Sequence, residues 1–219
     1  MNHLYYNIHS HRKPQGINEV CIRNAFLTRL GRFEPNYFLS TGLHPWHVSR
    51  FSTEDLLHNL RTNCKNKQVK AIGEIGLDKF AADYEIQKKY FELQVTFAAQ
   101  QNFPIIIHQV KSVEGIELIT KDFYEPIILH GFNGHLSVWE QLNKNGNTYI
   151  SIGSNSINPS SKLLQAIQEI PLEKLFIETD NASVLVQTVY KKIADIRGIT
   201  LQELVEAIAV NFNKVFNPN

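Results

Sequence analysis

Eight short apolar runs, separated along most of the chain by segments with helical periodicity, constrain the fold more than any other feature. The runs lie at 4–9, 20–26, 37–42, 69–74, 104–108, 126–130, 148–152 and 175–180. Each run is too short for a helix, and several are rich in β-branched or aromatic residues, which is typical of strands. The segments Ile105-Ile106-Ile107 and Ile127-Ile128-Leu129 do not alternate with polar residues, as expected for parallel strands buried on both faces.

Helical patterns fall between most of these runs. The clearest are a periodic stretch over 83–102 and a C-terminal one over 201–216, which Thr200 and Glu203 open as a capping box. Repeated strand–helix units with eight strands predict an α/β fold, a closed (β/α)8 barrel of the TIM type. An open doubly wound sheet is the alternative, but no glycine-rich phosphate turn follows the first run.

The first two connections are short for such a barrel. Eight residues separate His11 from Val20 and ten separate Phe26 from Tyr37, whereas a crossover between parallel strands needs about a dozen or more. We therefore expect a barrel trimmed in its first two βα units. With 43% apolar residues, residues 1–219 can fill one core, so a single domain is expected.

Charge and apolar patterning exclude several classes of protein. The 22 basic and 21 acidic residues nearly cancel, so the chain lacks the basic excess of a protein that coats nucleic acid. No apolar stretch reaches the roughly 18 residues of a membrane helix, and the N-terminus lacks the apolar core of a signal peptide. A cytoplasmic protein without a membrane role or an obligate protein partner is expected. Cys21 and Cys64 are expected to be reduced thiols without a function.

Titratable residues stand where the apolar runs end, and in a barrel these ends meet at one rim, where active sites are built. They are His9 and His11 after the first run, Glu74 after the fourth, His108 after the fifth, His130 after the sixth and Asp180 in the eighth. Four imidazoles and two carboxylates buried together are costly unless cations neutralise them. Six ligands with one shared carboxylate suffice for two divalent cations, such as Zn, Mn or Mg, which activate water for hydrolysis.

Each residue taken alone has a simpler interpretation: His9 and His11 could be two hydrogen-bonded histidines, and Glu74 could belong to a buried salt bridge. These interpretations would all have to be correct at once at six positions, and this favours the metal site. Weaker candidates surround the set. His44 ends the third run and either contacts the substrate or serves the structure. Glu178 shares a strand face with Asp180 and is expected to lie deeper and orient a ligand. Asp78, placed after a glycine turn beyond the fourth strand, is expected to cap or orient nearby backbone.

Six motifs in the same order resemble the TatD-type metal-dependent hydrolases. They are Asn7-Ile8-His9-Ser10-His11, Gly42-Leu43-His44-Pro45, Ala71-Ile72-Gly73-Glu74-Ile75-Gly76-Leu77-Asp78, residues 104–108, His130-Gly131-Phe132-Asn133-Gly134 and Glu178-Thr179-Asp180. The resemblance covers nearly the whole chain. It implies a barrel of the metallo-dependent hydrolase type and phosphodiester hydrolysis, as in a deoxyribonuclease.

The resemblance also implies a role for each residue. His9, His11, Glu74 and Asp180 would hold one metal, and Glu74, His108 and His130 the other. Glu74 would bridge both ions, and Asp180 would accept the proton of the attacking water. These two residues are therefore the expected catalytic pair.

Three departures from the family pattern concern the substrate. The first motif opens with Asn7 where Asp is usual, so this position can hydrogen-bond but brings no charge. Val110 replaces an expected arginine, and 181–183 replace the usual Ala-Pro-aromatic loop. DNA or a small phosphodiester is the expected substrate. The alternatives are a small phosphoester, amide or lactone hydrolysed at the same site, and a non-catalytic metal-binding relative.

Overall fold

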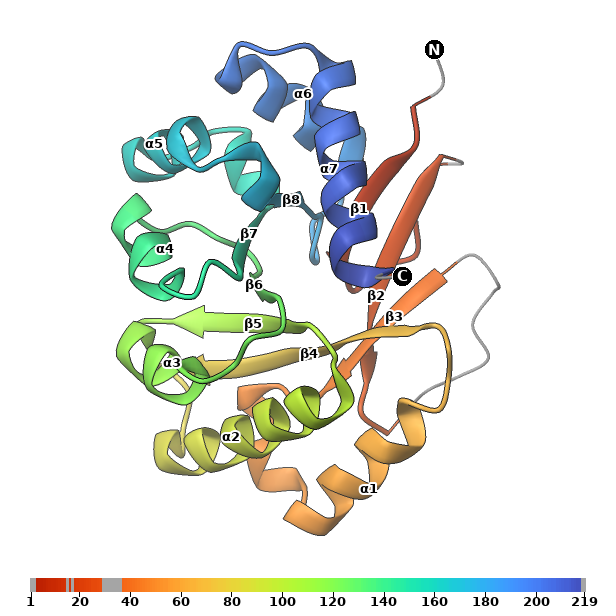
Figure 1. The fold of residues 1–219 in the computed structure, drawn as a ribbon, viewed down its shortest axis with the longest axis vertical. Helices are drawn as coiled ribbons and strands as arrows, with labels where there is room; N and C mark the ends of the chain where they lie inside the picture. Colours follow the sequence, from red (N-terminus) through yellow and green to blue (C-terminus); the bar gives the residue numbers. More distant parts are fainter. Residues whose placement is uncertain (1–2, 15, 17, 29–36, 218–219) are drawn as a thin grey trace.

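The structure, a computed structural model, describes residues 3–14, 16, 18–28 and 37–217. Eight strands form one parallel sheet in the order of the sequence. In Figure 1 the first three strands lie on the right side of the view and the other five toward its middle. The strands are β1 (Tyr5–Ser10), β2 (Glu19–Phe26), β3 (Tyr37–Gly42), β4 (Val69–Asp78), β5 (Ile105–Val110), β6 (Ile127–Leu129), β7 (Thr148–Ile152) and β8 (Leu175–Ile177).

The two ends of the sheet meet between β1 and the segment after β8. Ser10 and Asp180 form an isolated parallel bridge. The Asp180 N–H donates to the carbonyl of His9 at 3.0 Å, and the His11 N–H donates to the carbonyl of Asp180 at 3.1 Å. The sheet is thus a nearly closed barrel, which confirms the predicted fold class.

Helices lie on the outer side of the sheet. They are α1 (Thr53–Asn63), α2 (Tyr84–Gln101), α3 (Val113–Thr120), α4 (Leu136–Leu142), α5 (Ser161–Glu169), α6 (Val186–Arg197) and α7 (Leu201–Phe216), with short 3-10 helices η1 (Pro45–Arg50), η2 (Ser154–Ser156) and η3 (Leu172–Lys174). In Figure 1 α3, α4 and α5 follow one another along the left side of the view, opposite β1 to β3. No helix follows β1 in the described part of its connection to β2, as expected for the first trimmed unit. Most of the connection after β2, residues 29–36, lies outside the described residues, so the expectation for the second unit stays a prediction. The expected capping box at Thr200 and Glu203 is also present.

Strand β4 differs from the expectation, because it continues four residues past Glu74 to Asp78. Its register with β5 changes between Ile72 and Ile75, so two residues of β4 oppose one of β5 in a bulge. Glu74 therefore lies inside a strand and not at its end, and Asp78 is the last residue of the strand and does not follow a turn. The bulge interrupts the alternation of side chains around Glu74.

Two glycines of β4 are required by the close approach of β5. A side chain at Gly73 would place its Cβ 2.7 Å from the Cβ of Ile106, and one at Gly76, whose φ is +138°, would lie 2.1 Å from the His108 carbonyl oxygen. Neither position tolerates a larger residue without displacing β5. The glycines of this motif thus fix how β5, which carries His108, lies beside Glu74.

The other strand ends also shift by a few residues. Strand β5 continues past His108 to Val110, β6 ends at Leu129 directly before His130, and β8 ends three residues before Asp180. Fully buried isoleucines such as Ile72, Ile106 and Ile128 fill the sheet beneath these positions. The apolar core thus supports the rim from which the polar side chains project.

Candidate metal centre

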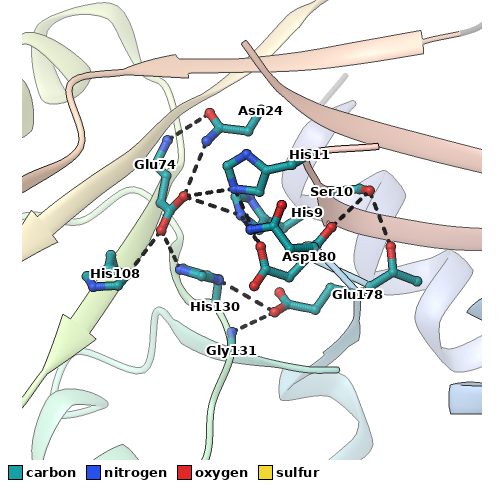
Figure 2. Close-up of polar contacts among 12 residues, drawn as sticks. His9, Ser10, His11, Asn24, Glu74, His108, His130, Gly131, Glu178 and Asp180 are labelled. Carbon is teal, nitrogen blue, oxygen red and sulfur yellow. Dashed lines mark hydrogen bonds and ion pairs between the residues drawn. The ribbon is translucent and has the colours of Figure 1, made fainter. Parts of the chain in front are cut away.

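Glu74 lies at the centre of the polar cluster, and its two carboxylate oxygens face different groups (Figure 2). Its side chain is only 4% exposed. Around Oε2 lie His11 Nε2 at 3.3 Å, His9 Nε2 at 3.5 Å and Asn24 Nδ2 at 3.2 Å. Around Oε1 lie His130 Nε2 at 2.8 Å, His108 Nδ1 at 3.0 Å and His44 Nε2 at 3.2 Å. One carboxylate therefore joins two sets of nitrogen donors.

Asp180 completes the set of donors around His9 and His11. Its Oδ1 atom lies 3.4 Å from His11 Nε2 and 3.7 Å from His9 Nε2. The Asp180 side chain is 40% exposed, whereas the His9 side chain is completely buried. Asp180 thus occupies the open side of the cluster, where a substrate or a water molecule has access.

The cluster shifts the protonation of its central pair. Burial alone would raise the pKa of Glu74, but the charge of His130 and hydrogen bonds from His108, His11 and His130 hold this pKa well below its usual range. Burial likewise opposes protonation of His130, yet the carboxylates of Glu74 and Glu178 raise its pKa well above the ordinary value. Without metal, the two residues form a buried ion pair.

Two carboxylates outside the central set orient its imidazoles. Glu178, fully buried, accepts the Gly131 N–H at 2.7 Å and lies 3.5 Å from His130 Nδ1 (Figure 2). Asp78 Oδ2 lies 3.2 Å from His108 Nε2. In each case the carboxylate favours the proton on the ring nitrogen it faces, which leaves the other nitrogen, directed at Glu74, free to bind a cation.

His44 is arranged differently from the other histidines. Its Nδ1 accepts the Trp46 backbone N–H at 3.1 Å, so the neutral ring carries its proton on Nε2. That nitrogen faces Glu74 Oε1. His44 is therefore suited to donate a hydrogen bond to an oxygen, as a substrate contact requires, and is less suited to bind a metal through Nε2.

Asn24, on β2, was not identified from the sequence, yet it bonds to Glu74 twice. Its Nδ2 donates to Glu74 Oε2, and its Oδ1 accepts the Glu74 N–H at 3.3 Å. The sequence contained a signal for Asn24, because it lies two positions after the apolar Ile22 in a predicted strand. Side chains two residues apart share a strand face, so Asn24 is a polar residue on the face of Ile22. Asn7 lies deeper: its Oδ1 accepts the Thr179 N–H at 3.1 Å, next to Asp180. It positions the segment that carries Asp180.

The cluster has the donor set that a divalent cation requires. Both nitrogens of His9 are buried, and neither has a hydrogen-bond partner among the described residues. An orphaned imidazole between two carboxylates is costly without a cation. Three overlapping sets have donor atoms within 4.8 Å of one another: His9, His11 and Asp180; His9, Glu74 and His130; His44, Glu74 and His108. The residues present therefore fit a metal centre.

A cleft of about 780 Å³ opens over the cluster. Its wall contains His44, Trp46, Arg50, Phe26 and Asn181 beside the metal-binding candidates. Val110 is not part of this wall. The position where the family pattern expects an arginine therefore does not face the cleft, while Arg50, from η1, does.

Comparison with known proteins places the chain in a family. The model of the TatD-related DNase family matches residues 22–217. The chain is 29% identical over 201 residues to the metal-dependent hydrolase YabD of Bacillus subtilis, covering 83% of this chain and 78% of that protein. It is 28% identical over 215 residues to the 3′-5′ ssDNA/RNA exonuclease TatD of Erwinia tasmaniensis, covering 86% and 82%.

A solved structure has the same fold. The TatD homologue YjjV from Escherichia coli superimposes with a TM-score of 0.87 at 23% identity, covering 100% of both chains. The fold and the cluster define a metal-dependent hydrolase built on a parallel barrel. The chain belongs to the TatD family, which confirms the resemblance seen in the sequence. Among the described residues, no helix is long and apolar enough to cross a membrane.

Proposed function

We propose that this chain is a single-domain phosphodiesterase that hydrolyses nucleic acid with the help of two divalent cations bridged by Glu74. The observation that carries the proposal is the placement of Glu74, whose two oxygens face separate groups of histidine nitrogens. A carboxylate in this position can serve both cations at once, and two adjacent cations suit the in-line displacement at phosphorus.

The distances to the two oxygens of Glu74 divide the candidate ligands into two groups. His9, His11 and Asp180 join Glu74 Oε2 in one group, and His108 and His130 join Glu74 Oε1 in the other. Zn, Mn and Mg are the candidate ions, and the high share of imidazole favours zinc or manganese over magnesium. When bound, such ions supply a hydroxide nucleophile near neutral pH and neutralise the charge of the phosphate.

The chain's own residues then hold and move protons. Asp180, on the open side of the cluster, accepts the proton of the attacking water, because its carboxylate is 40% exposed and therefore accessible to that water. His44 donates from Nε2 to a phosphate oxygen, since its Nδ1 is already occupied by the Trp46 N–H. Glu178 and Asp78 keep His130 and His108 in the tautomers that leave their inward nitrogens free.

Nucleic acid is the proposed substrate class because of two supports. The Erwinia relative is named as an exonuclease acting on single-stranded DNA and RNA, and Arg50 lines the cleft above the cluster, where a guanidinium can pair with a phosphate. A metal-dependent hydrolase acting only on small esters is the competing outcome of the same test.

The test is an add-back assay. Metal-stripped protein receives Zn²⁺, Mn²⁺ or Mg²⁺, and hydrolysis of a labelled single-stranded oligonucleotide and of bis(p-nitrophenyl) phosphate is followed. We expect both substrates to be cleaved only with metal, with kcat/KM higher for the oligonucleotide. Cleavage of the small diester alone would restrict the function to small phosphoesters, and no metal-dependent cleavage of either would overturn the proposal.

A further inference from the structure

Trp46 is a large aromatic side chain that remains 61% exposed beside the metal centre. It belongs to η1, two residues after His44, and lines the cleft. Its ring meets the rings of His44 and His108 nearly edge-on, with centroids at 5.0 Å and 6.0 Å. A tryptophan with this exposure contributes little to the core, so its position calls for another explanation.

The indole is held in a fixed orientation although it is exposed. Its Nε1–H donates to Asp78 Oδ2 at 2.7 Å, and the same oxygen lies 3.2 Å from His108 Nε2. The other oxygen of Asp78 accepts the Phe80 N–H at 2.9 Å. Asp78 is only 4% exposed, so its carboxylate is a rigid anchor. One buried residue therefore links the ring directly to the metal cluster.

The surroundings of the ring match one kind of ligand. Phe26, 63% exposed, and Arg50 line the same cleft. Exposed aromatic rings together with a cationic side chain are the combination that binds single-stranded nucleic acid, where bases stack on the rings and phosphates meet the charge. A small phosphate ester without a base would use neither ring.

We propose that Trp46 is the specificity-determining residue that stacks against the nucleobase next to the phosphate being cleaved. This inference rests on the proposed function and adds to it the group that distinguishes nucleic acid from other phosphodiesters. Stacking involves the face of the base and does not depend on the sugar, so bases of DNA and of RNA can both stack on Trp46. Asp78 acts as a positioning residue for the ring.

The first experiment pairs a change in the protein with a change in the substrate. Wild type, Trp46→Ala and Trp46→Phe cleave an oligonucleotide and the same oligonucleotide with an abasic residue on either side of the scissile phosphate. We expect wild type to prefer the intact substrate about tenfold, mainly through KM. Trp46→Ala should abolish the preference, and Trp46→Phe, which keeps a ring, should restore most of it. Leu118→Ala, an exposed residue outside the cleft, should retain the full preference.

The outcomes separate stacking from a structural role. If Trp46→Ala lowers cleavage of intact and abasic substrates equally, the residue only shapes η1 and the inference is wrong. If it keeps the tenfold preference, another group reads the base and the inference is also wrong. Hydrolysis of the intact oligonucleotide and of bis(p-nitrophenyl) phosphate by metal-loaded wild type tests the proposed function separately, so a failure of the stacking inference is distinguished from a failure of the proposed function.

A binding measurement supplies a readout that is independent of turnover. The chain has two tryptophans, and Trp139 donates from Nε1 to the Thr148 carbonyl in a partly buried position, so Trp139→Phe leaves Trp46 as the single reporter. Slowly cleaved phosphorothioate oligonucleotides of thymidine and of uridine should both quench its fluorescence, and an abasic one should not. Equal quenching by all three, or no quenching at saturation, would overturn the inference.

Discussion

Glu178 contacts His130 at the ring nitrogen that does not face Glu74, with its Oε1 atom 3.5 Å from Nδ1 of the imidazole. The same oxygen accepts the N–H of Gly131, so the carboxylate fixes both the ring and the turn that carries it. The Nε2 atom of His130 is thereby directed at Glu74. A carboxylate beneath a metal-binding histidine is worth about 10–100-fold in metal affinity.

Glu178→Gln should therefore weaken metal binding about 10–100-fold while the barrel stays folded, because the amide oxygen can still accept the Gly131 N–H. Zinc titration against a competing chelator measures the affinity, and Glu173→Gln, at an exposed position of η3, is the matched control. An unchanged affinity would remove Glu178 from this orienting role.

Glu74→Gln should abolish metal-dependent hydrolysis and lower the amount of bound metal. A neutral amide offers one oxygen and no charge, so it cannot offset two dications. Elemental analysis of the purified variant, together with the add-back assay, checks both effects. Wild-type turnover with unchanged metal content would contradict a shared ligand at this position.

Asp180→Asn should separate metal binding from proton transfer. The amide can still offer an oxygen to a cation but cannot take a proton from water, so kcat should fall by about 10²–10⁴ while at least one metal remains bound. Rates measured at saturating substrate, with metal content determined in parallel, make the comparison. Activity within about tenfold of wild type would assign the proton acceptor elsewhere.

Metal binding should release protons near neutral pH. The pKa of His130 lies well above its ordinary value in the metal-free protein because of Glu74 and Glu178, despite its burial, yet an imidazole must be neutral to bind a cation. Titration calorimetry in two buffers of different ionisation enthalpy should show about one proton released per protein. The apparent affinity should rise with pH until the raised pKa of His130 is passed.

The same pair sets the pH range of metal-free stability. Because folding raises the pKa of His130, its contribution to the free energy of unfolding is fully present below the ordinary pKa of about 6.5. This contribution is lost as the pH rises through the pKa of His130 in the folded protein. The pKa of Glu74 is lowered, so its contribution is complete above about 4.5 and is lost as pH falls through the folded value. Urea unfolding of metal-stripped protein should show declining stability on both sides of this window.

Arg50→Gln should raise KM for oligonucleotides and flatten the salt dependence of binding. Removing one phosphate contact reduces the slope of log K against log salt by about 0.7–1. Arg61→Gln, an exposed arginine of α1 outside the cleft, is the control of equal charge. If both variants shift the slope equally, only net charge is being measured and Arg50 makes no specific contact.

The rim of the barrel could be predicted because polar residues interrupt apolar runs at the right places. His9 and His11 are two residues apart, and this spacing alone put both imidazoles on one side of the chain. The structure brings both Nε2 atoms to Glu74 Oε2. Where the strand pattern was regular, as in β3 and β7, the expected bounds match the observed ones.

Irregular backbone explains what the sequence did not reveal. The bulge in β4 adds a residue to one strand only, and apolar periodicity carries no sign of it, so Glu74 was expected at a strand end. Asn24 went unrecognised because the face of β2 that lines the rim depends on register, which a single strand does not define. Asp78 was expected to cap or orient nearby backbone. Its contacts with His108 and Trp46 could not be predicted, because these residues lie far from Asp78 in the sequence and meet it only in the folded chain.

The seam that closes the barrel uses the backbone of residues whose side chains form the cluster. His9, His11 and Asp180 exchange main-chain hydrogen bonds across a separation of about 170 residues. Loop closure over such a distance is entropically costly, so this contact forms after the local strand–helix units. A partly folded chain therefore lacks high-affinity ligand geometry, and metal uptake during refolding should coincide with the last step. A cation held by His9, His11 and Asp180 would therefore bind tightly only after the barrel has closed.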